Sequence, residues 1–441
     1  MTFDPSAWRV VVIGAGHSGV AACTLLLDRG VRELCVNDAR PVEQWSDAAR
    51  ALAERGASLH GGDHQLDFST FDLVVISPGV PPFPQLERAP RIWGEIELAT
   101  RAMRHPAPIV AVGGTNGKST VTTLLGALLA TRGAVFAGGN LGEPLATHAD
   151  ERFAHVVLEV SSFQMERVET FAPKVALLLN VSDDHLDRYE DFAAYVHAKG
   201  NMFAAQGPDD LAVIPYDDPR CRAQATRGRA AIATFGIEAE ATVRVEAEHL
   251  VDTRDGERYA RAEIRLAGAH NALNVAAAIA AARACGVPAA AVREVLREFR
   301  GLPHRMELVR ELAGVRYYDD SKGTNVGAVV TALRGLAEER CVLIAGGRDK
   351  EGSYAPLVRA LAERGRAVVL IGEAAERIAA AVGEVVPVYF ASTLPEAVGL
   401  ARGAARAGDA VLLSPACSSF DMFRDYKQRG DVFAAAVRAL D

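Results

Sequence analysis

The chain has 441 residues and a formal net charge of −8, with 49% hydrophobic and 24% charged residues. At roughly 100–200 residues per domain this length predicts two to four globular domains, and the acidic balance leaves no basic face for nucleic acid. No apolar run reaches the roughly 18 residues of a membrane span, and Asp4 and Pro5 near the start are unlike a signal peptide. The six cysteines lack CxxC spacing, which favours reduced, mostly buried thiols. We therefore expect a cytoplasmic protein.

Lysine is rare in this chain. Of 48 basic residues only six are lysine, and the rest are arginine. A retained lysine therefore favours a need for an amine, either as a compact point charge or as a group that can lose its proton. The six are Lys118, Lys174, Lys199, Lys322, Lys350 and Lys427.

The first segment predicts a parallel α/β sheet. Residues 8–16 are typical of a buried strand and a glycine turn, and residues 34–38 and 73–77 are typical of further strands. Strands that alternate with helical stretches favour a parallel sheet. The Pro-rich residues 105–108 precede the next strand, and we place the first domain at 1–97.

The middle segment predicts a second, mostly parallel sheet with a small additional β piece. Residues 241–266 are typical of short strands with polar turns, and an Ala-rich helix covers 271–285. Gly301-Leu302-Pro303 breaks the following helix, so we place the second domain at 98–302. Its expected strands are 109–112, 156–160, 175–180 and 211–215.

The last segment, 303–441, repeats the α/β rhythm. Its apolar strands are expected at 341–347, 367–372 and 410–415, and each ends in small or polar residues. In open α/β sheets ligands bind beyond the carboxyl ends of the strands. We therefore expect binding loops after these strands.

A first glycine cluster, Gly14-Ala15-Gly16-His17-Ser18-Gly19, follows the first strand. Glycines let the backbone approach a diphosphate, and Asp38 at the end of the next strand is placed to accept from a hydroxyl or a base edge. The cluster alone predicts a diphosphate ligand such as NAD or FAD. A purely structural tight turn is the alternative.

A second cluster, Gly113-Gly114-Thr115-Asn116-Gly117-Lys118-Ser119, lies between a strand and an apolar helix that we expect to begin at Thr120. This arrangement predicts an ATP site, because backbone amides surround phosphates, Lys118 reaches the outer phosphates and the Ser119 hydroxyl binds Mg²⁺. The loop is shorter than the standard eight-residue pattern, whose first glycine would fall at Val112.

Glu159, His185 and Lys199 follow as possible contributors to a metal site. Glu159 ends a predicted strand, which suits the oxygen ligands that Mg²⁺ prefers, whereas a single histidine is less usual. Each of these three residues alone is also compatible with a solvated surface position or a helix cap. Asp183 and Asp184, beside His185, could simply start a helix.

Polar loops in the second half carry the remaining candidates. Two polar segments flank the Ala-rich helix: Asn271 to Asn274 and Gly301-Leu302-Pro303-His304-Arg305. Helix capping or interdomain packing is the alternative to a binding role for these segments. Hydroxyls, amides and ammonium groups favour a small anionic substrate at three further loops, although structural turns remain possible. These loops are 319–325, 346–350 and 414–419.

The motifs GTNGKS, LEVSSFQ, NVSDDHLDRY, GLPHRME, DSKGTN, GGRDK and SPACSSFD together resemble the Mur ligases of bacterial cell-wall synthesis. Their order and spacing are most similar to the branch that adds D-glutamate. The resemblance covers nearly the whole chain, from about Val10 to Gly430. It implies an N-terminal UDP-binding Rossmann-like domain, a central ATPase domain and a C-terminal Rossmann-like domain that binds D-glutamate.

The resemblance also implies a reaction. ATP phosphorylates the terminal carboxylate of UDP-N-acetylmuramoyl-L-alanine, and the amine of D-glutamate then attacks the acyl phosphate to give an amide, ADP and phosphate. The diphosphate at the first glycine cluster would then belong to UDP, so no nicotinamide is needed. We expect a monomer that binds these small molecules and no nucleic acid.

Roles for individual residues are implied in the same way. Ser119 would serve Mg²⁺, Glu159 would hold one Mg²⁺ and His185 a second. Lys199 matches a lysine carried as a carbamate that supports the metal and the γ-phosphate. Lys118, Glu159, His185 and Lys199 are the expected catalytic residues. The expected ATP contacts are Gly114, Thr115, Asn116, Gly117, Lys118, Ser119, Thr120, Asn274, Arg305 and Asp320.

Two groups of substrate contacts are implied. The UDP-sugar substrate would be bound by Ser18, Asp38, Arg40, Ser77, Asn140 and Ser161. The D-glutamate would be bound by Lys322, Thr324, Lys350, Ser419 and Tyr426.

The chain departs from the family pattern at three places. His17 stands where an apolar residue is common, and Tyr426 stands where a phenylalanine is expected. Arg348 and Asp349 precede Lys350 in an order that varies within the family, so we assign them no role.

Four alternatives remain. They are another Mur ligase, which adds L-alanine or a diamino acid, a folylpolyglutamate synthase, an NAD-dependent dehydrogenase, and a non-catalytic nucleotide-binding regulator. The Asp-Asn-Pro-Arg-like motif that is typical of the diamino-acid-adding ligase is absent from this sequence.

Overall fold

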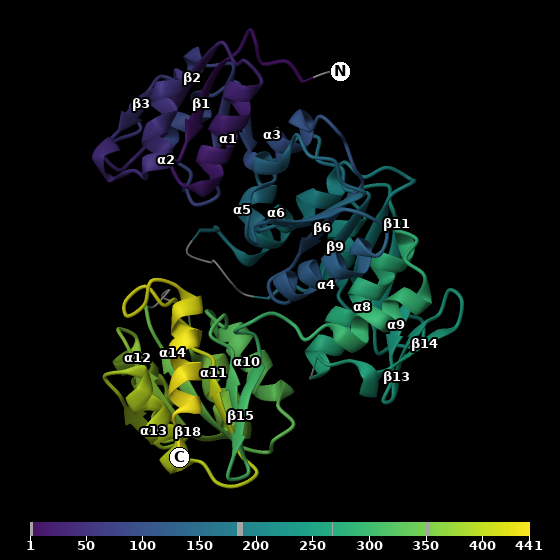
Figure 1. Cartoon of the computed structure of the whole chain (residues 1–441), viewed down its shortest axis with the longest axis vertical. Coiled ribbons are helices and arrows are strands. Elements are labelled where there is room, and N and C mark those ends of the chain that lie inside the picture. Colours follow the sequence, from purple (N-terminus) through teal and green to yellow (C-terminus); the bar gives the residue numbers. More distant parts are fainter. Residues whose placement is uncertain (1–2, 183–187, 267, 349–352) are drawn as a thin grey trace. The chain divides into compact units, whose positions relative to one another are not determined.

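The computed structural model describes residues 3–182, 188–266, 268–348 and 353–441. These residues form two compact units. The first contains the chain up to Val181 together with Asp191–Tyr259 and Val275–Val295, and the second consists mainly of Ala260–Asn274 and Leu296–Asp441. Three β-sheets carry the fold, and helices cover them (Figure 1).

The first sheet has five strands in the order β3-β2-β1-β4-β5, and all its strand pairs are parallel. Val10 to Ile13 at its centre have no solvent exposure, as expected for a strand covered on both faces. The strands are β1 Arg9–Ile13, β2 Glu33–Asp38, β3 Ser58–Gly61, β4 Leu73–Ile76 and β5 Ile92–Gly94, and the α-helices are α1 His17–Asp28, α2 Asp47–Arg50 and α3 Glu95–Ala102.

The second sheet has nine strands in the order β14-β13-β12-β11-β10-β9-β6-β8-β7. Its pairs from β7 to β12 are parallel, and β12 and β13 are antiparallel. Its strands are β6 Ile109–Gly113, β7 Val135–Gly139, β8 His155–Glu159, β9 Val175–Leu178, β10 Leu211–Pro215, β11 Ala231–Gly236, β12 Val243–Val245, β13 His249–Asp252 and β14 Glu257–Ala260. The accompanying helices are α4 Lys118–Ala130, α5 Ser162–Met165, α6 Phe192–Ala204, α7 Pro219–Ala225, α8 Ala269–Ala284 and α9 Ala289–Glu298.

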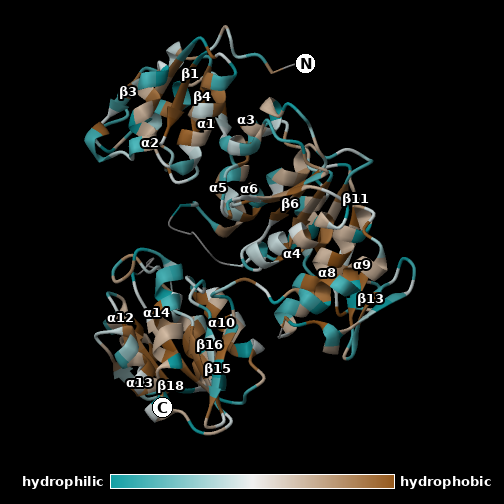
Figure 2. Cartoon of the chain, in the orientation of Figure 1, coloured by the Kyte–Doolittle hydropathy of each residue, from teal (hydrophilic) through white to brown (hydrophobic). Residues whose placement is uncertain are grey.

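The third sheet has six strands in the order β15-β16-β20-β17-β18-β19, and only β15 pairs antiparallel. Two hydrophobic clusters pack on its opposite faces, and Figure 2 shows the apolar strands between more polar helices. The elements are β15 Glu307–Leu312, β16 Val315–Asp319, α10 Val326–Gly335, β17 Cys341–Gly346, α11 Ala355–Arg364, β18 Gly365–Ile371, α12 Ala375–Val382, β19 Val388–Phe390, α13 Leu394–Ala404, β20 Ala410–Leu413 and α14 Tyr426–Arg438.

The predicted α/β class with mostly parallel sheets is confirmed, and every expected strand is present. The expectation that α4 begins at Thr120 is wrong, because the helix begins at Lys118 after Gly117 in left-handed conformation. Strands β3, β5, β7, β11, β15, β16 and β19 were not predicted. Most of them are short, glycine-rich or carry charged residues, so their apolar signal is weak. Strand β11, with the sequence Ala-Ile-Ala-Thr-Phe-Gly, is apolar and was overlooked.

Each predicted domain contains one sheet, but the boundaries at 97/98 and 302/303 stay predictions. Helix α3 runs across the first boundary, and the second lies in the link between α9 and β15. All six cysteines are free thiols and five are buried, as expected. Among the helices that the structure describes, none is long and apolar enough to cross a membrane.

Candidate active site

The phosphate-loop residues follow β6, which pairs in parallel with both β8 and β9. Gly114 and Gly117 have φ angles of +142° and +85°, which favour glycine. Asn180 holds the loop from the end of the neighbouring strand. Its carbonyl accepts from the Thr115 N–H at 3.0 Å, its Oδ1 accepts from the Asn116 N–H at 2.9 Å, and its Nδ2 donates to the Asn116 carbonyl at 2.9 Å. The sequence analysis assigned Asn180 no role.

Two of the rare lysines meet at one carbonyl of this loop. The Lys118 Nζ donates to the Gly114 carbonyl at 3.0 Å and to the Thr115 carbonyl at 2.8 Å. The Lys199 Nζ, on α6, donates to the same Gly114 carbonyl at 2.8 Å. Lys199 is 4% exposed, and its Nζ lies 4.5 Å from the centre of the Tyr195 ring. Two of the six lysines that the composition singled out therefore lie at the phosphate loop.

Glu159 ends β8 beside the phosphate loop, because its register partner on β6 is Val112. The side chain is buried, and its Oε1 accepts from the Asn140 Nδ2 at 2.7 Å. Its Oε2 has no hydrogen-bond partner among the described residues. A buried carboxylate oxygen without a partner is costly, so this donor set fits a hard cation such as Mg²⁺. Ser119 is buried in the first turn of α4. His185 lies outside the described residues.

A pocket of about 550 Å³ lies in the first unit, above the carboxyl ends of β1, β2 and β4. Five of the six predicted UDP-substrate residues line it: Ser18, Asp38, Arg40, Ser77 and Asn140. The sixth, Ser161, is not among the lining residues. It caps α5 by accepting from the Gln164 N–H, and Gln164 itself lines the pocket. The sequence analysis missed Gln164 and also His64, which stacks on Phe83 with 4.5 Å between ring centres.

The three glycines of the first cluster have different structural reasons. A Cβ at Gly14 would lie 2.8 Å from the Ser77 Cβ, and its φ of +102° favours glycine. A Cβ at Gly19 would lie 1.8 Å from the Gly14 carbonyl oxygen. A Cβ at Gly16 would meet no atom within 4 Å. Gly14 and Gly19 are therefore required by the fold, whereas Gly16 keeps open space in front of the backbone that a ligand can occupy.

Asp38 is saturated with donors from the protein. Its carboxylate accepts from the Ala15 N–H and from the Arg40 backbone N–H, Nε and Nη2, at 2.8–3.0 Å. Burial alone would raise the pKa of Asp38, but these hydrogen bonds and the Arg40 charge outweigh it and lower the pKa to about 2. Asp38 is thus an anion that fixes the glycine turn and Arg40.

The candidate D-glutamate residues lie in loops at the carboxyl ends of β16 and β20, which are adjacent parallel strands. The Lys322 Nζ lies 4.0 Å from the centre of the Tyr426 ring, and Ser419 is buried in the loop after β20. Thr324 precedes α10, and its N–H donates to the Lys322 carbonyl. Lys350 lies outside the described residues.

Asp320, the first residue after β16, is buried, and its Oδ2 accepts from the Ser414 Oγ at 2.6 Å. Burial raises its pKa to about 7, against the Ser414 hydrogen bond and the nearby Arg305 charge. Asn274 is buried, and its Nδ2 donates to the Asn271 Oδ1 at 3.2 Å. Asn274, Arg305 and Asp320 belong to the second unit and the phosphate loop to the first, so their joint contact with one ATP stays a prediction.

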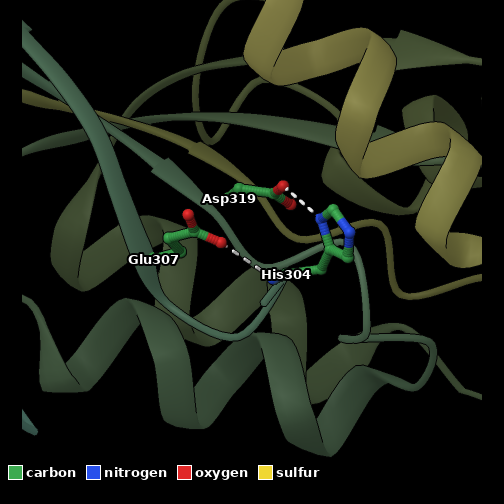
Figure 3. A group of neighbouring side chains, drawn as sticks. All are labelled: His304, Glu307 and Asp319. Carbon is green, nitrogen blue, oxygen red and sulfur yellow. Dashed lines mark hydrogen bonds and ion pairs between the residues drawn. The ribbon is translucent and has the colours of Figure 1, made fainter. Parts of the chain in front are cut away.

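His304, Glu307 and Asp319 form a cluster in the second unit, where the start of β15 pairs with the end of β16 (Figure 3). The His304 Nδ1 and the Asp319 Oδ2 are 2.7 Å apart, and the Glu307 Oε2 accepts from the His304 backbone N–H at 3.1 Å. The His304 carbonyl in turn accepts from the Lys322 N–H. These hydrogen bonds account for the cluster without a metal ion, and they attach the residue before Arg305 to the Lys322 loop.

A phosphate loop on a parallel sheet, with a ligand pocket and further polar loops at strand ends, defines a nucleotide-binding α/β protein. Residues 112–282 match the Mur ligase middle domain, and residues 304–417 match the Mur ligase glutamate ligase domain. A UDP-N-acetylmuramoylalanine–D-glutamate ligase of Geobacter metallireducens is 44% identical, over 99% of this chain and 98% of the relative. The chain belongs to the Mur ligase family.

Other known proteins agree with this placement. A relative of the same name in Anaeromyxobacter dehalogenans is 43% identical over 96% of both chains. The MurF ligase of Thermotoga maritima, solved in complex with ADP, has a TM-score of 0.63 over 99% of both chains at 16% identity. The UDP-N-acetylmuramate–alanine ligase MurC of the same organism has a TM-score of 0.60 at 20% identity, over 98% of this chain and 99% of that chain. At these identities the two structures show the shared fold.

The first prediction separates ligand space from packing at the glycine turn. Gly16→Ala should weaken the binding of UDP, measured by calorimetry, about tenfold or more, and should shift the thermal midpoint by only about 2 °C, because the added methyl meets only ligand. Gly19→Ala is the matched control and should lower the thermal midpoint clearly, because its methyl overlaps the Gly14 carbonyl. A Gly16→Ala variant that binds UDP as well as wild type would contradict the assignment.

The second prediction concerns the unpartnered oxygen of Glu159. Glu159→Gln should be at least as stable as wild type without metal, because it removes a buried charge, and should lose most of the thermal stabilisation that Mg²⁺ with ADP gives the wild type. Glu97→Gln is the control, since both Glu97 oxygens already accept hydrogen bonds from Arg101 and from residues 169–171. It should lower stability and leave the Mg²⁺ effect intact. Equal Mg²⁺ responses of wild type and Glu159→Gln would exclude the metal role.

Proposed function

We propose that this chain is an ATP-dependent ligase that adds D-glutamate to UDP-N-acetylmuramoyl-L-alanine in the synthesis of peptidoglycan precursors. The observation that carries the proposal is 41–44% identity, over nearly the full length of both chains, to ligases of that name. The phosphate loop, the 550 Å³ pocket and the polar loops of the third sheet supply one candidate place for each of the three substrates.

The reaction joins two anions before it forms an amide. A carboxylate oxygen of the substrate attacks the γ-phosphorus of ATP, and the bond to ADP breaks. The amine of D-glutamate then attacks the carbonyl carbon of the acyl phosphate, loses a proton, and phosphate leaves. Lys118, the loop amides from Gly114 to Gly117, Ser119 and Thr120 hold the ATP phosphates and offset the repulsion between the anions.

The metal ligands in this proposal are Ser119, Glu159, His185 and the modified Lys199, with Glu159 at one Mg²⁺ and His185 at a second. Bound Mg²⁺ supplies positive charge that offsets the charge of the phosphoryl oxygens. The support from the structure is the buried Glu159 Oε2 without a partner among the described residues. Asn140 orients the other oxygen of Glu159 and also lines the UDP pocket, so it links the two substrates' sites within the first unit.

A carbamate at Lys199 is supported by the charges around it. Lys118 and Lys199 both donate to the Gly114 carbonyl, so their two ammonium groups repel one another in a buried place. Addition of CO₂ to the neutral amine gives a carbamate and releases a proton. The carbamate is an anion whose N–H still donates to the Gly114 carbonyl, so the repulsion becomes an attraction. A guanidinium does not undergo this addition, in keeping with a lysine at this place.

The remaining roles follow the pocket and the loops. Arg40, Ser18, Ser77 and Asn140 contact the UDP-sugar from the pocket wall, and Asp38 positions Arg40. Ser161 acts on the same substrate through the α5 cap. Lys322, Thr324, Lys350, Ser419 and Tyr426 hold D-glutamate, while Asn274, Arg305 and Asp320 contact ATP.

The proposal includes the organisation of the protein. The three domains are 1–97, 98–302 and 303–441, and they act together as a monomer in the cytoplasm. Closure of the domains around the substrates would exclude water from the acyl phosphate.

The third prediction is the activity itself. Purified protein with ATP, Mg²⁺ and UDP-N-acetylmuramoyl-L-alanine should release phosphate when D-glutamate is added, and should not do so with L-alanine or a diamino acid. Equal release with either of these amino acids would contradict the proposed specificity. Phosphate release without any amino acid would indicate hydrolysis in place of ligation.

The fourth prediction tests the carbamate. Lys199→Ala should lower kcat by about 100-fold or more, and a short carboxylate such as acetate should restore part of it by replacing the lost anion. Lys174→Ala is the matched control, because Lys174 pairs with Asp210 at the surface and should show neither effect. Full activity of Lys199→Ala would exclude the carbamate. The carbamate would also be excluded if acetate did not restore the lost activity and removal of CO₂ did not change the activity of the wild type.

A further inference from the structure

Arg429 on α14 is a buried cation in the second unit. It is 1% exposed, one of the largest fully buried side chains among the described residues. Its hydrogen bonds to described residues go to hydroxyl and carbonyl oxygens, not to a carboxylate. Burial lowers the pKa of Arg429 to about 10, so it stays charged at neutral pH. A buried charge without a hydrogen-bonded counter-ion is costly, and an apolar side chain of similar size would avoid that cost.

The guanidinium joins the loops that carry the candidate D-glutamate contacts. Its Nε donates to the Ser321 Oγ at 3.0 Å, and its Nη2 donates to the Ser321 carbonyl at 2.8 Å. Nη1 and Nη2 both donate to the Cys417 carbonyl at 3.3 Å. Ser321 directly precedes Lys322, and Cys417 lies two residues before Ser419. One planar group therefore fixes the distance between the loop after β16 and the loop after β20.

Two more segments meet the same group. The Ser321 Oγ donates to the Tyr426 carbonyl at 2.7 Å, which ties the start of α14 to the β16 loop. A Cβ at Gly347, in the loop after β17, would lie 3.3 Å from the Arg429 Nη1 and 2.2 Å from the Ser418 carbonyl. The next residue on α14, Gly430, leaves room for the His304–Asp319 pair of Figure 3. Described residues of the loops after β16, β17 and β20 thus pack around Arg429.

We infer that Arg429 is the positioning residue of the D-glutamate subsite, holding Lys322, Thr324, Ser419 and Tyr426 in one arrangement through Ser321 and Cys417. It reaches these acceptors with a rigid fork of donors, which a lysine ammonium does not offer. The inference rests on the proposed function, since it takes D-glutamate as the ligand of these loops. Arg429 itself does not touch the substrate in this account.

The test compares Michaelis constants for the three substrates. Arg429→Lys keeps the charge and loses the fork, so it should raise KM for D-glutamate about 10- to 100-fold, because small misplacements of binding groups are costly. KM for ATP and for UDP-N-acetylmuramoyl-L-alanine should stay within about twofold of wild type. Arg334→Met is the matched control in the same unit, since Arg334 pairs with Glu363 at the surface, and all three KM values should be unchanged.

Ser321→Ala is the second variant and carries the test if Arg429→Lys does not fold. It removes one acceptor of the guanidinium and the donor to Tyr426, and it should raise KM for D-glutamate about 3- to 10-fold with the other KM values unchanged. Unchanged KM for D-glutamate in the folded variants, or an equal rise for all three substrates, would overturn the positioning role. A wild type that makes no product with D-glutamate would instead contradict the proposed function.

Discussion

The position of β6 between two parallel partners is the constraint on which the candidate ATP site depends. Parallel strands bring their carboxyl ends to one edge of a sheet. The register of β6 with β8 places Glu159 beside the phosphate loop, and its register with β9 places Asn180 on the other side. Strand pairing therefore brings together the buried Glu159, the phosphate loop and the Asn180 amide that holds the loop, although they lie far apart in sequence.

The chain accepts buried charge at the places where we expect chemistry. Lys199 and Glu159 are almost fully buried near the phosphate loop, and Asp320 and Arg429 are buried beneath the loops of the third sheet. None of these groups is needed to fill a core, and each costs free energy of desolvation. The buried Glu97 is different, because its carboxylate is saturated by donors from a neighbouring segment and serves to attach α3. The way a buried charge is compensated therefore separates Glu97 from the candidate site residues, whereas burial alone does not.

The sequence predicted the elements and residues whose signal is local. Long apolar strands, the glycine turn after β1 and the phosphate loop before α4 all have short-range patterns, and they are where the sequence placed them. Asn180 and Gln164 lie inside the quoted motifs NVSDDHLDRY and LEVSSFQ but received no role, and Arg429 lies outside the motifs. The partners of all three residues are on other strands and loops, which a local pattern does not reveal. Strands such as β15, with the sequence Glu-Leu-Val-Arg-Glu-Leu, were missed because charged residues at a sheet edge conceal the alternation. The roles of all the candidate site residues remain predictions, and His185 and Lys350 lie outside the described residues.

The choice between amine and guanidinium follows the geometry of each site. In a chain with six lysines among 48 basic residues, Lys118 and Lys199 converge on one carbonyl, and Lys322 lies over an aromatic ring at the edge of a loop. These are places for a compact charge that can turn toward a ligand or be modified. Arg429 stands where several fixed acceptors must be joined at once, and Arg40 where a carboxylate is gripped by two nitrogens. Arginine also supplies the generic surface charge of this chain, so it is informative only where its rigid fork joins fixed acceptors, as at Arg429 and Arg40. Lysine is rare in this chain, so its presence at a loop that follows a strand is informative in itself.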